Sequence, residues 1–112
     1  MLPPLVSVIM LTYNREEFVG RAIRSILGQT LRDFEFIIVD NGSTDQSGAI
    51  ADSYAKIDKR IQVIHRERGN IGCGRNTGLD VAVGEYIAFI DDDDYTEPDY
   101  LEFLYNLSVD NN

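Results

Sequence analysis

The sequence predicts an α/β fold in which helices flank a parallel sheet. Two observations lead to this class. Short apolar runs rich in β-branched residues recur along the 112 residues, as in strands that are covered on both faces. Between these runs lie segments whose apolar residues recur at helical spacing. Because strands and helices alternate, the strands are expected to run parallel, with right-handed crossovers between them.

Four strands are expected, at residues 5–11, 34–39, 61–65 and 86–90. The first, second and fourth are nearly continuous apolar runs, whereas the third is shorter and weaker. We predict that all four form one sheet in the order 3-2-1-4, counted along the chain. The carboxyl ends of parallel strands meet at one edge of a sheet, where open α/β folds bind ligands.

The first two helices carry start signals in the sequence. Asn14 and Glu17 form a capping-box pattern before the first helix, and Gly28 can end that helix. Ser43 and Gln46 form a second pattern of this kind before the next helix. The side chains of Asn14 and Ser43 are therefore expected to cap the first turns of these helices.

The remaining two helices follow the third and fourth strands. One is expected over residues 74–83, with Gly84 closing it, and the other near Pro98, a residue suited to a first helical turn. No internal repeat or low-complexity segment interrupts the sequence. We therefore expect residues 1–112 to form a single domain.

The net charge of −9 is concentrated at one end of the sequence. Residues 91–112 hold eight of the nineteen acidic residues and no lysine or arginine, whereas the first ninety residues are close to neutral. This distribution lacks the basic face that nucleic-acid binding needs. A nucleic-acid partner is therefore not expected.

Membrane-spanning and secreted proteins are also not expected classes. No apolar stretch approaches the length of a membrane span, and the N-terminus lacks the basic region and cleavage site of a signal peptide. Cys73 is the single cysteine and cannot form an internal disulfide, which favours a reducing compartment. We expect a cytoplasmic location.

Polar residues follow each of the three strong strands. Thr12, Tyr13 and Asn14 follow the first, residues 40–43 follow the second, and residues 91–94 follow the last. Taken singly, the first two groups also suit a helix cap and a turn. Because all three lie at the carboxyl edge of the predicted sheet, a shared binding crevice is the stronger interpretation.

Asp91, Asp92, Asp93 and Asp94 form the most unusual part of this edge. A solvated acidic tail is one interpretation. Carboxylates this close repel one another, however, and a divalent cation bound by oxygen ligands removes that cost. Their position directly after an apolar strand favours the cation site.

Residues 69–78 contain four glycines and Arg75. Glycines let the backbone approach a ligand closely, and an arginine beside them suits a phosphate. A flexible connector with a surface arginine is the alternative. The pattern is neither GxGxxG after a first strand nor GxxxxGK[ST]. The sequence therefore does not support a dinucleotide-binding fold or a P-loop. His65 and Cys73 are lone residues and are expected to be structural.

Four segments together resemble one known family. Residues 6–14, 37–45, 72–78 and 84–94, followed by Pro98-Asp99, resemble in order the motifs of family 2 glycosyltransferases. The resemblance covers nearly the whole chain. It implies a Rossmann-like parallel sheet that forms the N-terminal, nucleotide-sugar-binding part of a GT-A fold.

The resemblance also implies roles for single residues. Thr12, Tyr13 and Asn14 would line the nucleotide site, with Tyr13 beside the base. Asp40 would hydrogen-bond uracil or its equivalent, and Arg75 would lie near the phosphates. The implied donor is a nucleotide-diphosphate sugar, with a UDP-sugar expected.

Metal binding is implied at the aspartate run, which matches the family's DxD motif. Asp93 would face Mn²⁺ or Mg²⁺. Asp91 would also reach the metal or its waters, and Asp91 or Asp92 would reach the ribose, while Asp94 adds charge. The cation would bridge the diphosphate and stabilise it as the sugar leaves.

The implied reaction is an inverting transfer to a saccharide or lipid-linked acceptor, as in polysaccharide biosynthesis. An acceptor hydroxyl attacks while a carboxylate general base removes its proton. The family's general base and acceptor half come later than Asn112, so no residue here is assigned that role. We expect these 112 residues alone not to transfer sugar. The inner face of the membrane is a second possible location.

Two alternatives from other classes remain. A haloacid-dehalogenase-type phosphatase also places aspartates after an apolar strand, but it needs DxDx[TV] after the first strand. A nucleotide- or metal-binding module without catalysis is the other alternative. Titration with UDP and Mn²⁺ tests binding, and a sugar-transfer assay separates an enzyme from a module.

Overall fold

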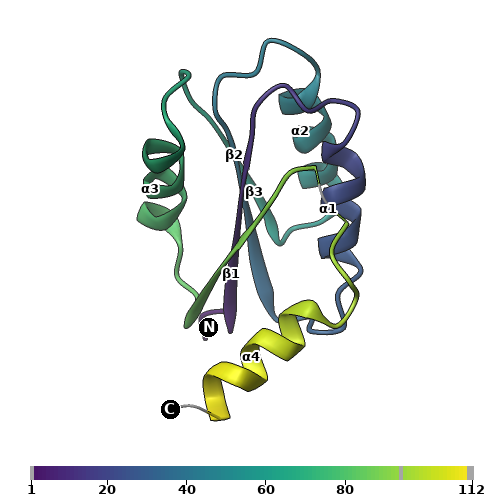
Figure 1. Ribbon diagram of the computed structural model, residues 1–112, viewed down its shortest axis with the longest axis vertical. Coiled ribbons are helices and arrows are strands. Elements are labelled where there is room, and N and C mark those ends of the chain that lie inside the picture. Colours follow the sequence, from purple (N-terminus) through teal and green to yellow (C-terminus); the bar gives the residue numbers. More distant parts are fainter. Residues whose placement is uncertain (1, 94, 111–112) are drawn as a thin grey trace.

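The computed structural model describes residues 2–93 and 95–110. A four-stranded parallel sheet has α1 and α2 on one face and α3 on the other, with α4 below (Figure 1). The elements in chain order are β1 Val6–Thr12, α1 Val19–Leu27, β2 Phe34–Asp40, α2 Ser47–Ile57, β3 Ile61–His65, α3 Ile71–Val81, β4 Tyr86–Ile90 and α4 Tyr100–Asp110.

The sheet has the strand order β3-β2-β1-β4, which confirms the prediction. All three neighbouring pairs are parallel, and β1 and β2 match from Val6 opposite Phe34 to Thr12 opposite Asp40. The carboxyl ends of these strands therefore meet at one edge. This is the geometry that the predicted binding crevice requires.

The main core lies between the sheet and the α1/α2 face. Alternate residues of β1 and β2 point into it, as the two-residue period of a strand requires. Phe36 and Ile38 of β2 have no exposed surface, and Leu101 brings α4 into the same cluster. The apolar stripe of α1 packs there through Val19, Ala22, Ile23 and Ile26.

The α3 face has a smaller core, formed by Ile9, Ile37 and Val39. Here α3 packs on the sheet through glycines. A Cβ on Gly74 would lie 2.5 Å from Leu11 Cδ2, and one on Gly78 would lie 2.7 Å from Ile9 Cγ2. Gly74 and Gly78 thus lie in a helix, as the expected range 74–83 implied, and the alternative of a flexible connector is wrong for residues 71–78.

The strand β4 is buried on one face only. Ala88 and Ile90 face the main core, whereas Ile87 and Phe89 are 40% and 42% exposed. The prediction of a strand covered on both faces is wrong for β4. The reason is that α3 lies over β1 and β2, with no comparable helix over this side of β4 in the described structure.

The start of α4 is attached to the end of α1 by a buried glutamine. The Gln29 side chain donates to the Glu97 carbonyl at 2.6 Å and accepts from the Leu101 N–H at 2.9 Å. The Thr30 N–H also donates to the Pro98 carbonyl. The fourth helix begins at Tyr100, close to Pro98 as expected.

Both predicted capping boxes are wrong. α1 begins at Val19, after Phe18, and α2 begins at Ser47, after Gln46, in each case without a side-chain cap. Asn14 instead has a positive φ of 50° and lies in the loop before α1. The third helix begins earlier than expected, with the Asn70 side chain accepting from the Cys73 N–H.

Across the described residues, no helix has the length and apolar character needed to cross a membrane. The longest helices among these residues contain eleven residues, and a span needs about twenty.

Candidate functional site

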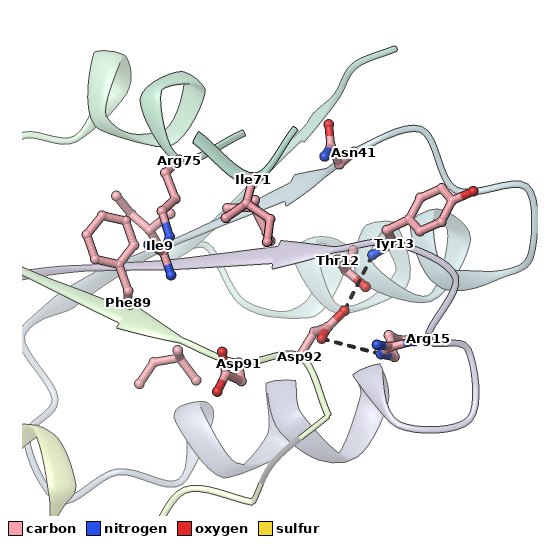
Figure 2. Close-up of a pocket in the computed structure, with 12 residues that line it drawn as sticks. Ile9, Thr12, Tyr13, Arg15, Asn41, Ile71, Arg75, Phe89, Asp91 and Asp92 are labelled. Atoms are coloured by element: carbon pink, nitrogen blue, oxygen red, sulfur yellow. Dashed lines mark hydrogen bonds and ion pairs between the residues drawn. The ribbon is translucent and has the colours of Figure 1, made fainter. Parts of the chain in front are cut away.

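A pocket of about 250 Å³ lies at the carboxyl edge of the sheet, on the α3 side (Figure 2). Strands β1 and β4 form its floor, and α3 forms one wall. It combines an apolar surface with both charge signs. Its lining residues are Ile9, Leu11, Thr12, Tyr13, Arg15, Asn41, Ile71, Arg75, Phe89, Ile90, Asp91 and Asp92. Five of the residues predicted from the sequence therefore come together here.

Thr12 and Tyr13 end β1 inside this pocket. Thr12 is 1% exposed, and its hydroxyl oxygen makes no hydrogen bond of ordinary geometry with any described residue. This oxygen is itself fully buried and lies beside the Asp92 carboxyl, so Thr12 supports that carboxyl rather than facing open space in the pocket. The Tyr13 N–H donates to Asp92 Oδ2 at 3.4 Å.

Asp92 is the half-buried member of the aspartate run. Burial raises the pKa of the Asp92 carboxyl, while the nearby Thr12 hydroxyl, the Tyr13 N–H and the Arg15 guanidinium act in the opposite direction. Arg15 Nε lies 3.8 Å from Asp92 Oδ1. The carboxylate is thereby held between β1 and the loop that follows it (Figure 2).

Asp91 and Asp93 are exposed and, among the described residues, have no hydrogen-bond or ion-pair partner. Asp91 lines the pocket, whereas Asp93 does not. Free carboxylate oxygens suit Mn²⁺ or Mg²⁺. In the described part of the chain no three His, Cys, Asp or Glu side chains gather into a metal site, so further ligand oxygens would be needed. Asp94 lies outside the described residues.

Two arginines give the pocket its positive charge. Arg75 extends from α3, and its guanidinium carbon lies 5.0 Å from the centre of the Phe89 ring on β4. Arg15 lies at the other end of the lining, beside Asp92 (Figure 2). An anionic ligand in this pocket would meet arginines from two different elements.

Asp40 and Asn41 are neighbours in the chain but lie on opposite faces of the sheet. Asn41 lines the pocket, whereas Asp40 does not. Asp40 Oδ1 accepts from the Ser43 N–H, and Asp40 Oδ2 lies 2.9 Å from His65 Nδ1 on the α2 side. The contact between Asp40 and a base therefore stays a prediction.

His65 joins two carboxylates on the α2 side. Its Nδ1 lies 2.9 Å from Asp40 Oδ2, and its Nε2 lies 2.9 Å from Asp52 Oδ1 on α2. Hydrogen bonds to Asp40 and Asp52 raise the pKa of His65, against the smaller opposing effect of burial. This arrangement agrees with the structural role expected for a lone histidine.

Asn14 joins two loops rather than lining the pocket. Its Oδ1 accepts from the N–H groups of Thr44 and Asp45, and its own N–H donates to Ser43 Oγ. The Arg15 N–H likewise donates to Ser47 Oγ. These bonds connect the loops after β1 and β2, so Asn14 supports the site from behind.

The sequence analysis assigned no individual site role to the other seven lining residues: Ile9, Leu11, Arg15, Asn41, Ile71, Phe89 and Ile90. The positions of Asn41 and Phe89 could have been predicted from the sequence, because alternation along a strand assigns each residue to one face of the sheet. Arg15 and Ile71 lie in or beside loops, where no such period exists. Cys73 is exposed on α3 and is not a lining residue.

A parallel α/β sheet with a charged pocket at its carboxyl edge has the arrangement in which open α/β folds bind ligands. Residues 7–112 match the model of glycosyl transferase family 2. The chain belongs to this family, which the sequence resemblance had implied.

A known relative and two solved structures agree with this assignment. The uncharacterised glycosyltransferase EpsJ of Bacillus subtilis is 52% identical over 92 residues, which is 82% of this chain and 27% of EpsJ. TarS of S. aureus, solved with UDP-GlcNAc, has a TM-score of 0.84 at 32% identity, over 94% of this chain and 31% of that one.

The mannosyltransferase PcManGT of Pyrobaculum calidifontis, solved with GDP-Man and Mn²⁺, has a TM-score of 0.75 at 26% identity. The match covers 83% of this chain and 28% of that one. These neighbours confirm the predicted GT-A fold. The chain spans less than a third of the length of each of these three proteins.

Proposed function

We propose that this chain binds the nucleotide-diphosphate part of a sugar donor, expected to be a UDP-sugar, in the pocket between β1, β4 and α3. The observation that carries this proposal is the pocket itself, which gathers Arg75, Asp91 and Asp92 around one cavity at the carboxyl edge of the sheet. Support also comes from the solved complexes, since TarS holds UDP-GlcNAc and PcManGT holds GDP-Man.

The proposed pose follows from the chemistry of the lining. The base lies toward Tyr13 and Asn41, where an aromatic ring and an amide group can stack and hydrogen-bond. The diphosphate lies toward Arg75 and Asp91. An arginine offers a fixed, planar set of donors for phosphate oxygens.

A divalent cation, Mn²⁺ or Mg²⁺, is proposed at Asp91 and Asp93, with the diphosphate supplying further oxygen ligands. When bound it would neutralise the charge that develops on the diphosphate as the sugar leaves. The Mn²⁺ in the PcManGT complex supports this part of the proposal. Asp92 would orient the ribose from its half-buried position.

We propose that the reaction in which this fold takes part is an inverting transfer of the sugar to an acceptor hydroxyl. No described residue is assigned to binding of the acceptor, to binding of the sugar or to the role of general base. Donor binding is therefore the function that these residues support directly, with a binding module without catalysis as the alternative. Sugar transfer from UDP-GlcNAc to an acceptor separates the two.

Isothermal titration calorimetry tests donor binding. We expect UDP to bind in the presence of excess Mn²⁺ and to bind more weakly in EDTA. UMP, which lacks the second phosphate, should depend less on Mn²⁺ than UDP does. Equal UDP affinity in Mn²⁺ and EDTA would contradict a cation that bridges the diphosphate.

A further inference from the structure

The segment between β3 and α3 contains an arginine beside the nucleoside end of the pocket. The Arg68 guanidinium carbon lies 4.0 Å from the centre of the Tyr13 ring. This is the shortest of the four arginine–ring contacts recorded among the described residues. No described carboxylate lies within ion-pair distance of Arg68, so its charge is not neutralised by a neighbour.

The backbone of Arg68 is held close to the loop after β2. Gly42 has a φ of +85°, and a Cβ there would lie 2.6 Å from the Arg68 nitrogen. Only glycine permits both this backbone conformation and this approach. Arg68 therefore extends from a position that the neighbouring loop fixes.

Asn41 holds the same segment from the pocket side. Its Nδ2 donates to the Gly69 carbonyl at 2.8 Å, and its Oδ1 accepts from the Gly69 N–H at 3.1 Å. This pair of bonds ties residue 69 to the end of β2. Because Asn41 also lines the pocket, the segment that carries Arg68 is attached next to the pocket lining.

The backbone of Tyr13 is fixed, but its ring is half exposed. A contact on the face of the ring is therefore needed to hold the ring in one orientation. The Tyr13 N–H bonds to Asp92, while the ring projects away from Asp91 and Phe89 (Figure 2). A guanidinium stacked on one face restricts rotation of the ring and leaves its edges and opposite face available. Arg75, by contrast, lies beside Phe89 at the other end of the pocket.

We propose that Arg68 is a positioning residue of the nucleoside pocket, which holds the Tyr13 ring in the orientation that receives the base. The proposal rests on the proposed donor function. It assigns Arg68 to the nucleoside rather than to the diphosphate, because the guanidinium lies on the ring of Tyr13. Direct binding of phosphate by Arg68 is the competing role, and the test separates the two.

The test compares three ligands on the wild-type chain and on Arg68→Ala. UDP and uridine should each bind about two- to fivefold more weakly to the variant, as loss of an exposed cation–π contact implies. Inorganic pyrophosphate with Mn²⁺ should bind equally well to both. Arg24→Ala is the matched control, since Arg24 bonds to Tyr54 outside the pocket. Arg68→Lys should recover part of the loss.

A second measurement needs no ligand. NMR of protein labelled at tyrosine should show the Tyr13 ring signals moving in Arg68→Ala and unchanged in Arg24→Ala. Unmoved Tyr13 signals would overturn the stacking on which the proposal depends. Loss of UDP and pyrophosphate binding with uridine binding retained would overturn it in favour of a phosphate ligand.

The two proposals fail in different ways. If the wild-type chain binds neither UDP nor uridine, the proposed donor function is wrong and the role of Arg68 falls with it. If the wild-type chain binds both and Arg68→Ala binds them equally well, only the positioning role is overturned.

Discussion

The two faces of the sheet differ most at its carboxyl edge. On the α2 side, Asp40, His65 and Asp52 bond to one another and fill the space with internal contacts. On the α3 side, the same edge is hollow, and Asp91 has no described partner there. Asp40 and Asn41, adjacent at the end of β2, thus make internal contacts on one face and line the pocket on the other.

The difference extends into the cores beneath. In the described part of the chain, fifteen buried residues form the cluster between the sheet and α1, α2 and α4, against three on the α3 side. The free energy of folding is therefore expected to come mainly from the first face. Few side chains on the α3 face are needed for the stability of the fold. This face can therefore carry an open pocket.

The largest expected effect on stability comes from comparing the removal of a phenylalanine side chain on one face of the sheet with its removal on the other. Phe36→Ala should lower the free energy of unfolding by about 3–5 kcal/mol, since Phe36 is fully buried in the main core. Phe89→Ala should cost less than about 1 kcal/mol, because Phe89 is 42% exposed. Urea unfolding of both variants checks the contrast, and equal losses would contradict it.

Next in size is the effect of Mn²⁺ on the open side. With Mn²⁺ at a hundred times its Kd, the wild-type chain should gain about 2.7 kcal/mol of stability. Asp93→Asn should lose most of this gain and melt no lower than the wild type in EDTA, since a like charge is removed. Thermal melting in Mn²⁺ and in EDTA measures both effects.

Asp80→Asn is the control for this experiment, because it removes the same charge from the exposed surface of α3. It should keep the full Mn²⁺-dependent shift. Retention of the full shift by Asp93→Asn would show that Asp93 is not the principal metal ligand.

A smaller effect separates Asn41 from Asp40. Asn41→Ala should weaken UDP binding by about 1 kcal/mol, roughly fivefold, through loss of polar contacts at the pocket wall. Asp40→Asn should lower stability while changing UDP affinity less, since its carboxylate bonds to Ser43 and His65. Calorimetry with UDP, in Mn²⁺ and in EDTA, is the measurement. The reverse ranking would return the base contact to Asp40.

The smallest expected effect is the pH dependence from His65. Its pKa is raised in the folded state, so its contribution to stability is full below the ordinary histidine value of about 6.5. That contribution is lost as the pH rises through the higher folded value. Because His65 is half exposed, screening limits the effect to less than about 1 kcal/mol.

His65→Gln should accordingly remove a fall in stability between pH 6 and pH 8. Urea unfolding of both proteins across this range tests it. A wild-type stability that rises through this interval more than that of the variant would reverse the predicted sign.

Most of the fold could be predicted from the sequence, because periodicity and strand alternation are local signals. The four strands and their order are confirmed. The helix starts were less predictable. Asn14 and Ser43 have the chemistry of caps, but tertiary contacts between the two loops use the Asn14 amide and the Ser43 hydroxyl instead.

The candidate site was predictable in outline and less so in detail. Motif positions brought Thr12, Tyr13, Arg75, Asp91 and Asp92 to one pocket, where the structure has them. Choosing between Asp40 and Asn41 required knowing which face each residue occupies. A one-residue difference along a strand reverses that face, so the motif alone could not decide it.

The two glycines under α3 have a consequence for the size of ligand that the pocket admits. Gly74 and Gly78 let the helix rest on Leu11 and Ile9 with no intervening methyl group. The clearance between helix and sheet therefore sets the width of the cleft that Arg75 borders. Gly74 and Gly78 do not line the pocket, yet they influence its width. An alanine methyl group at either position would push α3 away from the sheet and widen this cleft without altering its charge.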